Sequence, residues 1–358
     1  MPRPYPPNMA RRAATGPTLI PVDEARSALP GPVASMRPRV AAAPFNSPDH
    51  IFEVKWDGIR AQLASEGGTT RLTDRRGGDL LRLLPEMRDV RLPDGVLLDG
   101  ELIVCDSRGR PSYDLLAGRL GPRAAQRGRG PIYVAFDLLY EASRPLLGRP
   151  LEERRKKLLA LGLTDRRVAV PDHLESDGEP FYDAVEEYGL EGIVAKRRRS
   201  PYVPGARTAD WLKYHVTPRA DVVIGGLIVD DVRGARTVLC GWHVANGLAF
   251  AGEAYVPPYL GRWLDEATRD FTSDASPFAT PMPMRGGSRW LRPTLVAIVE
   301  HDGSAGSELA DARFRALRFD GDVTTAIEET PVELPSAPPT GPAERPRLVV
   351  LQSLPFGR

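Results

Sequence analysis

Residues 53–60 read Glu53-Val54-Lys55-Trp56-Asp57-Gly58-Ile59-Arg60, and the rest of the sequence is organised around this segment. An apolar stretch at residues 51–54 runs directly into Lys55, and the Asp-Gly pair that follows predicts a tight turn. We therefore expect a strand that ends on a lysine, with one ammonium group at a sheet edge where a pocket usually opens. Taken alone, the segment is equally consistent with a surface lysine beside a hairpin turn.

Lysine is scarce throughout the chain. Of the 48 basic residues, only five are lysine and 43 are arginine. A lysine that remains in such a chain is a candidate for chemistry that the permanently protonated guanidinium cannot perform. Lys156 and Lys157 lie in the charged stretch LEERRKKLLAL at residues 151–161, which predicts a solvated helix face. The other three lysines, Lys55, Lys196 and Lys213, lie in motif-like segments.

Four further segments place a charged or aromatic side chain at the edge of an apolar strand. In chain order they are Leu98-Asp99-Gly100-Glu101-Leu102, Val134-Ala135-Phe136-Asp137-Leu138-Leu139, Glu191-Gly192-Ile193-Val194-Ala195-Lys196 and Trp211-Leu212-Lys213. Each one alone is more often a turn or a packed aromatic residue. Their joint occurrence in this order, after the Lys55 segment, is hard to assign to chance and indicates a shared site.

Composition and periodicity divide the chain into four parts. Residues 1–29 and 328–358 are rich in proline and predict a flexible arm and a flexible tail. The part at 30–217 mixes strands expected at 51–54, 95–98, 102–105, 132–136 and 192–195 with helices expected at 151–161 and 180–188. The part at 218–327 has short strands, expected at 222–229, 238–243, 249–254 and 295–300, which favour a small barrel. We place the domain boundary at residues 216–219.

Composition excludes several classes of protein. With 42% hydrophobic and 27% charged residues, the 358-residue chain is typical of a globular protein with two domains. It has no signal-peptide pattern and no apolar run of about 18 residues, so we expect a cytoplasmic protein and no membrane contact. Two cysteines, Cys105 and Cys240, suit a reducing compartment. The net charge of +1 does not by itself indicate nucleic-acid binding.

The motif order KWDG, LDGE, FDLL, EGIVAK and WLK resembles the nucleotidyltransferase motifs of ATP-dependent DNA ligases and mRNA capping enzymes. It is most similar to short bacterial ligases, including the ligase modules of bacterial end-joining proteins. Segments at 290–293, 295–300 and 313–320 resemble the end of the ligase OB-fold domain. The resemblance implies an α+β fold, in which an ATP-grasp-like nucleotidyltransferase (adenylation) domain at 30–217 precedes an OB-fold β-barrel domain at 218–327.

The same resemblance implies a role for each motif residue. Lys55 would be the nucleophile that becomes adenylated, with Lys196, Lys213 and a Mg²⁺ ion (or Mn²⁺ in its place) around the α-phosphate of ATP. Attack requires a neutral amine, and because free lysine has a pKa of about 10.4, nearby cations and desolvation are needed to lower it. The other implied roles are Phe136 stacking on adenine, Glu53 at the adenine edge, Arg60 near the ribose, Glu101 at the ribose or the metal, Glu191 beside the metal, and Arg75 at the nucleotide or the 5′-phosphate.

Two positions depart from the family pattern. The segment after Trp211 commonly reads Lys-x-Lys, but His215 takes the place of the second lysine. The closing OB-domain motif commonly reads Arg-x-Asp-Lys, but the chain has Gly321 at its end. In the family that lysine is linked to the first step, so we expect self-adenylation to be affected. Neighbouring arginines that could compensate are Arg313, Arg315 and Arg318.

The resemblance predicts a DNA ligase that seals nicks or breaks by way of a lysyl–AMP intermediate and an adenylated 5′-phosphate. We expect a monomeric, nucleoid-associated protein that acts on DNA with end-joining or repair proteins as partners. Two alternatives stay open. One is another covalent nucleotidyltransferase, either an RNA ligase or a capping-type enzyme. The other is a nucleic-acid-binding relative with impaired self-adenylation, because OB folds often bind nucleic acid in their own right.

Overall fold

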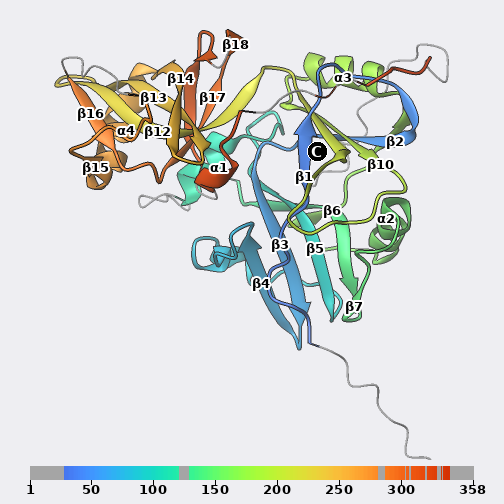
Figure 1. Ribbon diagram of the computed structural model, residues 1–358. Helices are drawn as coiled ribbons and strands as arrows, with labels where there is room; N and C mark the ends of the chain where they lie inside the picture. Colours follow the sequence, from blue (N-terminus) through green and yellow to red (C-terminus); the bar gives the residue numbers. More distant parts are fainter. Residues whose placement is uncertain are drawn as a thin grey trace, which may run out of the picture.

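The computed structural model describes residues 28–120, 129–280, 287–302, 304–305, 308–318, 321–328, 332 and 334–338. In Figure 1 these residues form two units that lie side by side, with two sheets in the first unit and a barrel in the second. Most of the arm expected at 1–29 and of the tail expected at 328–358 lies outside the described residues. In the part of the chain that is described, no helix is both long and apolar enough to cross a membrane.

The first sheet carries the lysine-bearing strands. Its order is β1-β11-β10-β2-β9, and all its pairs are antiparallel except β1 with β11. The strands are β1 (Arg37–Val40), β2 (Ser47–Val54), β9 (Leu174–Ser176), β10 (Gly192–Arg197) and β11 (Arg207–His215). Helix α3 (Gly178–Glu187) packs on β2 and β10. Their apolar side chains, among them Phe52, Phe181 and Ile193, form a buried core.

The second sheet follows the Asp57-Gly58 bend, where the chain leaves β2 of one sheet and enters β3 of the other. Its order is β4-β3-β5-β6-β7, and β8 pairs with β6. The elements of this sheet and its helices are β3 (Ile59–Glu66), β4 (Thr69–Asp74), β5 (Val96–Ile103), β6 (Ile132–Glu141), β7 (Arg144–Pro145), β8 (Val168–Ala169), α1 (Tyr113–Leu120) and α2 (Leu151–Ala160). Short 3₁₀ turns at Leu80–Arg82 and Pro85–Met87 cross from β4 to β5.

Strand β5 differs from the expectation. Two strands were expected at 95–98 and 102–105, but the structure has one continuous strand, Val96–Ile103, with the LDGE motif inside it. Gly100 does not turn the chain. A Cβ atom at Gly100 would lie 2.4 Å from the carbonyl oxygen of Val134, so glycine is needed for β6 to approach β5.

The second unit is a closed five-stranded barrel in which β12, β13, β14, β20 and β17 follow one another and β17 pairs back to β12. Its elements are β12 (Arg219–Asp230), β13 (Gly234–Val244), β14 (Gly247–Tyr255), α4 (Pro258–Thr268), β17 (Val296–Glu300) and β20 (Arg313–Leu317). Added to these are a 3₁₀ turn (Arg269–Phe271), β15 (Thr272–Ser273), β16 (Ser288–Leu291), β18 (Ser304–Ala305), β19 (Glu308–Leu309) and a last 3₁₀ turn (Val323–Thr325). A helix between the third and fourth barrel strands and a parallel pairing of β14 with β20 match the OB fold. The expected fold class is confirmed.

The two units share buried surface. Ile298 and Ala316 of the barrel belong to the apolar core of the six-stranded sheet, and the Tyr113 hydroxyl donates to the Leu317 carbonyl at 3.0 Å. The chain also returns to the first unit after the barrel. Val332 forms backbone hydrogen bonds with Val40, the last residue of β1, and with Ala42, and the Ser336 hydroxyl donates to Glu179 at 2.7 Å. The first unit is therefore in contact both with the barrel and with the segment that follows it.

Candidate active site

A cavity of about 710 Å³ lies where the first unit meets the barrel. All nine residues that the sequence singled out as site residues line it: Glu53, Lys55, Arg60, Arg75, Glu101, Phe136, Glu191, Lys196 and Lys213. Six of them lie in the strands β2, β3, β5, β6, β10 and β11, and the other three lie next to a strand: Lys55 after β2, Arg75 after β4 and Glu191 before β10. The fold therefore gathers residues up to about 160 positions apart into one site.

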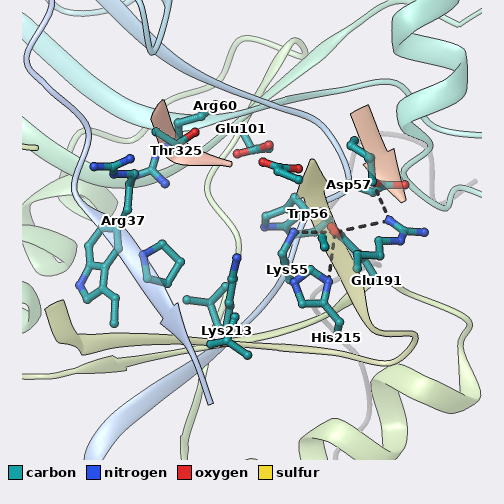
Figure 2. Close-up of a pocket in the computed structure, with 18 of the residues that line it drawn as sticks. Arg37, Lys55, Trp56, Asp57, Arg60, Glu101, Glu191, Lys213, His215 and Thr325 are labelled. Carbon is teal, nitrogen blue, oxygen red and sulfur yellow. Dashed lines mark hydrogen bonds and ion pairs between the residues drawn. The ribbon is translucent and has the colours of Figure 1, made fainter. Parts of the chain in front are cut away.

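Lys55 follows β2 directly, so the strand delivers its side chain to the cavity. Its backbone N–H donates to the Gly192 carbonyl at 2.8 Å, which extends the pairing of β2 with β10 by one residue. Its Nζ lies 2.6 Å from Oε1 of Glu191, and the side chain is 18% exposed. Figure 2 shows Lys55 among the residues that line the pocket, which also include Lys213. Lys55 thus presents a partly accessible amine that is held in place by a carboxylate.

Glu191 is the point on which several side chains converge (Figure 2). Besides Lys55, its Oε1 has Nη1 of Arg219 at 3.4 Å and Nδ1 of His215 at 3.6 Å. Burial raises the pKa of Glu191 above its ordinary value, although Lys55 opposes this shift. Its other oxygen, Oε2, is buried and has no hydrogen-bond partner among the described residues. A buried carboxylate oxygen of this kind is suited to an oxygen-seeking cation.

Glu53 and Phe136 define a second part of the cavity. Oε2 of Glu53 lies 2.5 Å from Nζ of Lys196, and Oε1 accepts from Nη1 of Arg155 at 2.7 Å. Burial alone would raise the pKa of Glu53, but Lys196 and Arg155 hold it below its ordinary value, so the carboxylate stays ionised. Nζ of Lys196 lies 4.0 Å from the centroid of the Phe136 ring. An aromatic face beside a fixed hydrogen-bond acceptor can recognise a flat base that carries an amino group.

Arg60 is fixed by a carboxylate that was not predicted as a site residue. Its Nε and Nη2 donate to the two oxygens of Asp99 at 2.7 and 2.6 Å, in the bidentate geometry that holds a guanidinium rigidly. The Tyr202 hydroxyl also donates to Asp99, at 2.6 Å. The guanidinium of Arg60 lies 4.6 Å from the Phe136 centroid, so it is held at the edge of the same subsite.

Several positively charged side chains gather at the barrel side of the cavity. Nε of Arg318 donates to both oxygens of Asp221, at 3.0 and 2.8 Å. Burial alone would raise the pKa of Asp221, but Arg318, Arg75 and Lys213 together hold it below its ordinary value. Arg75 and Lys213 belong to the first unit, so both units contribute positive charge here. This end of the cavity is suited to an anion such as a phosphate chain.

The comparison with known proteins agrees with this geometry. A family model described as "ATP dependent DNA ligase domain" matches residues 34–215, about half of the chain. The chain belongs to the ATP-dependent DNA ligase family. It is 32% identical over 190 residues to the SPbeta prophage-derived DNA ligase-like protein LigB of Bacillus subtilis, a match that covers 53% of this chain and 70% of LigB.

Longer ligase relatives match more of the chain. The multifunctional non-homologous end joining DNA repair protein LigD of Mycobacterium tuberculosis is 35% identical over 291 residues, which cover 78% of this chain. The chain spans only 37% of the length of that protein. A solved structure described as mycobacterial DNA ligase D complexed with ATP and MES is 32% identical, with a TM-score of 0.59. That match covers 83% of this chain and 98% of the ligase D chain.

The first departure from the ligase pattern, His215, does line the cavity. Burial, together with the charges of Lys55 and Lys213, lowers the pKa of His215 well below 6.5. The imidazole is therefore neutral at neutral pH, and it does not supply the positive charge that the expected lysine would carry.

The second departure, Gly321, does not line the cavity. It is buried, and a Cβ atom there would lie 2.6 Å from Cβ of Val296 and 2.9 Å from the Arg318 carbonyl oxygen. Phe319 and Asp320 of the same motif lie outside the described residues. Of the three arginines that could compensate, Arg318 lines the cavity. Arg313 is exposed, and Arg315 pairs with Glu300 and Asp114 away from the cavity lining.

Helix α2 corrects one expectation and supplies a residue that was missed. Its sequence predicted a solvated face, and Lys156 is indeed exposed, but Arg154 and Arg155 are buried. Arg154 pairs with Asp137 through two hydrogen bonds, and Arg155 reaches Glu53 at the cavity. Positions 151, 154, 155 and 158 share one helix face, so the spacing alone could have identified the two arginines as inward-facing. The site extends to Arg155, Arg219 and Asp221, which lie outside the motifs, and to Asp99, a residue of the LDGE motif to which no role was assigned.

Proposed function

We propose that this chain is an ATP-dependent DNA ligase that seals nicked or broken DNA through a covalent lysyl–AMP intermediate. The observation that carries the proposal is the convergence of the nine motif residues on one cavity, with the Lys55 amine partly accessible inside it. Membership of the ligase family supports the same function. So does the ATP complex of the mycobacterial ligase D structure that this chain resembles.

In the proposed first step, the neutral Lys55 amine attacks the α-phosphorus of ATP. The N–P bond forms while the bond from the α-phosphorus to its bridging oxygen breaks. Pyrophosphate leaves with that electron pair, and one proton of Nζ passes to solvent, so that the phosphoramidate nitrogen keeps the other. Lys196 and Lys213 stabilise the charge that develops on the phosphate oxygens, and the cationic group around Asp221 accommodates the leaving pyrophosphate.

In the second step, an oxygen of a DNA 5′-phosphate attacks the phosphorus of lysyl–AMP, so that Lys55 is released and the DNA end becomes adenylated. In the third, the 3′-hydroxyl attacks this 5′-phosphorus, AMP leaves and the strand is closed. Base recognition rests on Phe136, which stacks on adenine, and on Glu53, which accepts from its amino group. Arg60 binds near the ribose, and Arg75 binds the nucleotide or the 5′-phosphate.

A divalent cation fits the residues present. Glu191 has a buried oxygen without a hydrogen-bond partner in the described structure, and Glu101 lines the same cavity. These two carboxylates would hold Mg²⁺, or Mn²⁺ in its place, and the bound ion would neutralise negative charge on the phosphates. The described residues contain no cluster of three or more His, Cys, Asp or Glu side chains suited to a metal. A site made of Glu191 and Glu101 agrees with the usual coordination of Mg²⁺, which is bound by one or two carboxylates together with substrate phosphates.

Intact-mass measurement after incubation with ATP and Mg²⁺ tests the proposal. The wild-type protein should gain the mass of one AMP, and Lys55→Ala should gain none. Lys156→Ala is the matched control, because Lys156 is exposed on α2, and it should be adenylated like the wild type. An unchanged adduct in Lys55→Ala would overturn the assignment of the nucleophile. An adduct formed with GTP but not with ATP would favour a capping-type enzyme instead.

The names of the relatives suggest a biological setting. LigD of Mycobacterium tuberculosis is described as a non-homologous end joining DNA repair protein. We therefore propose that this chain acts as a monomer on DNA ends, together with end-joining or repair proteins. Size-exclusion chromatography with light scattering tests the monomer, and affinity capture from native extract tests the partners. Capture of no repair protein would contradict this setting and leave the ligase chemistry in place.

A second candidate function follows from His215 and Gly321. The neutral imidazole and the missing side chain remove two positive charges that the family pattern provides. The chain would then be a DNA-binding relative with impaired self-adenylation. Binding of a nicked duplex without any AMP adduct would favour this function over catalysis.

A further inference from the structure

Arg219, the first residue of barrel strand β12, inserts its guanidinium between carboxylates of both units. Its Nη1 donates to Oδ1 of Asp57 at 3.1 Å and lies 3.4 Å from Oε1 of Glu191. Its Nη2 and Nε donate to Oε1 of Glu300 at 3.0 and 3.2 Å. The side chain is 16% exposed. One planar cation therefore joins two carboxylates of the first unit to one of the barrel.

Two of these carboxylates flank Lys55. Oε1 of Glu191, which faces Arg219, is also the atom that holds Nζ of Lys55 at 2.6 Å. Asp57 is two residues after Lys55, and its other oxygen accepts from the backbone N–H of Tyr113 at 3.3 Å. A shift of the Arg219 guanidinium would change the position of both carboxylates. The amine of Lys55 would shift with them.

Other described contacts between the units do not touch the Lys55 amine or its carboxylate partner. The Tyr113 hydroxyl meets the Leu317 carbonyl, and Nη2 of Arg315 lies 3.7 Å from Asp114. These contacts also hold the barrel against the first unit, so the barrel can dock without Arg219. What Arg219 adds is a direct connection from the barrel to the carboxylate that holds the lysine.

We propose that Arg219 is a positioning residue for self-adenylation: from the barrel, it fixes Asp57 and Glu191 and thereby aligns the Lys55 amine with the α-phosphate of ATP. This inference rests on the proposed ligase function. Sealing of DNA that already carries a 5′-adenylate does not use Lys55 as a nucleophile. The loss of Arg219 should therefore slow the first step selectively.

Two rates distinguish a role of Arg219 in positioning Lys55 from a role only in docking the barrel on the first unit. One is the single-turnover rate of AMP transfer from ATP to the protein, and the other is the rate at which a pre-adenylated nick is sealed without ATP. In Arg219→Met the first rate should fall about a hundredfold, the effect expected of a misplaced reacting group. The second should change less than about threefold, which also shows that the variant is folded. Arg219→Lys restores the charge without the planar fork, and its adenylation rate should lie within about tenfold of wild type.

Asp114→Asn is the control, since it removes the contact between the units through Arg315, leaves Glu300 with both of its arginine partners, and changes a residue that does not line the cavity. It should change both rates by the same factor. Equal slowing of both rates in Arg219→Met, or an unchanged adenylation rate, would overturn the inference. If Arg219→Met loses both reactions, the two rates are compared in Arg219→Lys instead. Equal slowing of both rates in Arg219→Lys would also overturn the inference. A wild-type protein that forms no adduct would instead overturn the proposed function.

Discussion

Substitution of Arg155 by methionine tests the buried support of Glu53. Arg155 is almost fully buried, and its guanidinium donates to Glu53 at 2.7 Å, to the Phe136 carbonyl at 3.2 Å and to the Pro171 carbonyl at 2.6 Å. Removal of one partner of a buried ion pair usually costs about 3 to 5 kcal/mol. Because Lys196 still faces the other oxygen of Glu53 at 2.5 Å, we expect the lower end of that range, about 3 kcal/mol.

The assay is urea and thermal unfolding at pH 7. A loss of about 3 kcal/mol should lower the melting temperature by about 9 °C in a unit of this size. Lys156→Met, the exposed neighbour on α2, should change the free energy of unfolding by less than about 0.5 kcal/mol. The same variant tests the site, because Glu53 is proposed to contact adenine. The ATP concentration that gives half-maximal adduct formation should rise about tenfold in Arg155→Met.

A double-mutant cycle with Glu53→Gln isolates the pair. Each single substitution leaves buried charge without its partner, whereas the double variant leaves only Lys196 to be accommodated. The double variant should therefore lose about 1 to 3 kcal/mol less than the sum of the single losses. The reasoning is refuted if the losses are additive. It is also refuted if Arg155→Met loses less than about 1 kcal/mol.

Three further outcomes are expected. Gly321→Lys should not raise the adenylation rate, although it restores the lysine of the family pattern. Gly321→Lys and Gly321→Ala should each lower the free energy of unfolding by about 1 to 3 kcal/mol in urea, because a Cβ atom at this position would overlap Val296. The pKa values of Glu53 and Asp221 lie below their ordinary 4.5 and 3.8, so both carboxylates stabilise the fold at neutral pH. Unfolding measured from pH 7 to 3 should show this stability beginning to fall as the pH drops below those ordinary values, with its complete loss only below the lowered pKa values of the folded protein. Deletion from Val332 onward removes the hydrogen bonds that Val332 and Ser336 form with the first unit, and it should lower the melting temperature by several degrees. Deletion from residue 339 onward keeps every described contact and is the control.

Much of the site could be predicted because its residues lie in short motifs at the ends of strands. Lys55 follows β2 and precedes a bend, and Lys196 lies near the end of β10, so local sequence is enough to place each at a sheet edge. The order of the two domains could also be predicted, because the mixture of strands and helices at 30–217 gives way to a series of short strands at 218–327. The LDGE segment was harder to interpret. Gly100 suggests a turn, but the close approach of β6, which no local pattern reveals, makes it a strand residue.

The residues that were missed act through contacts between distant positions. Arg155 reaches Glu53 across 102 positions within the first unit, and Arg219 reaches Asp57 across 162 positions from the barrel, so the first pairing exists only after the first unit has folded and the second only after the barrel has docked on it. A lone arginine in an arginine-rich chain carries no local sign of such a role. Arg155 is a partial exception, because its helical spacing with Leu151 predicts an inward position, although not the carboxylate it meets.

The two departures from the ligase pattern acquire a physical meaning in the structure. His215 is neutral, and Gly321 has no room for a side chain, so neither can assist a phosphate by charge. Positive charge is instead gathered from both units around Asp221, where Arg318 is held by two hydrogen bonds and Arg75 and Lys213 lie close enough to lower the carboxyl pKa. Because this charge depends on the barrel, its effect on ATP depends on barrel docking. The proposed self-adenylation should therefore be more sensitive to contacts between the units than the motif residues alone would indicate.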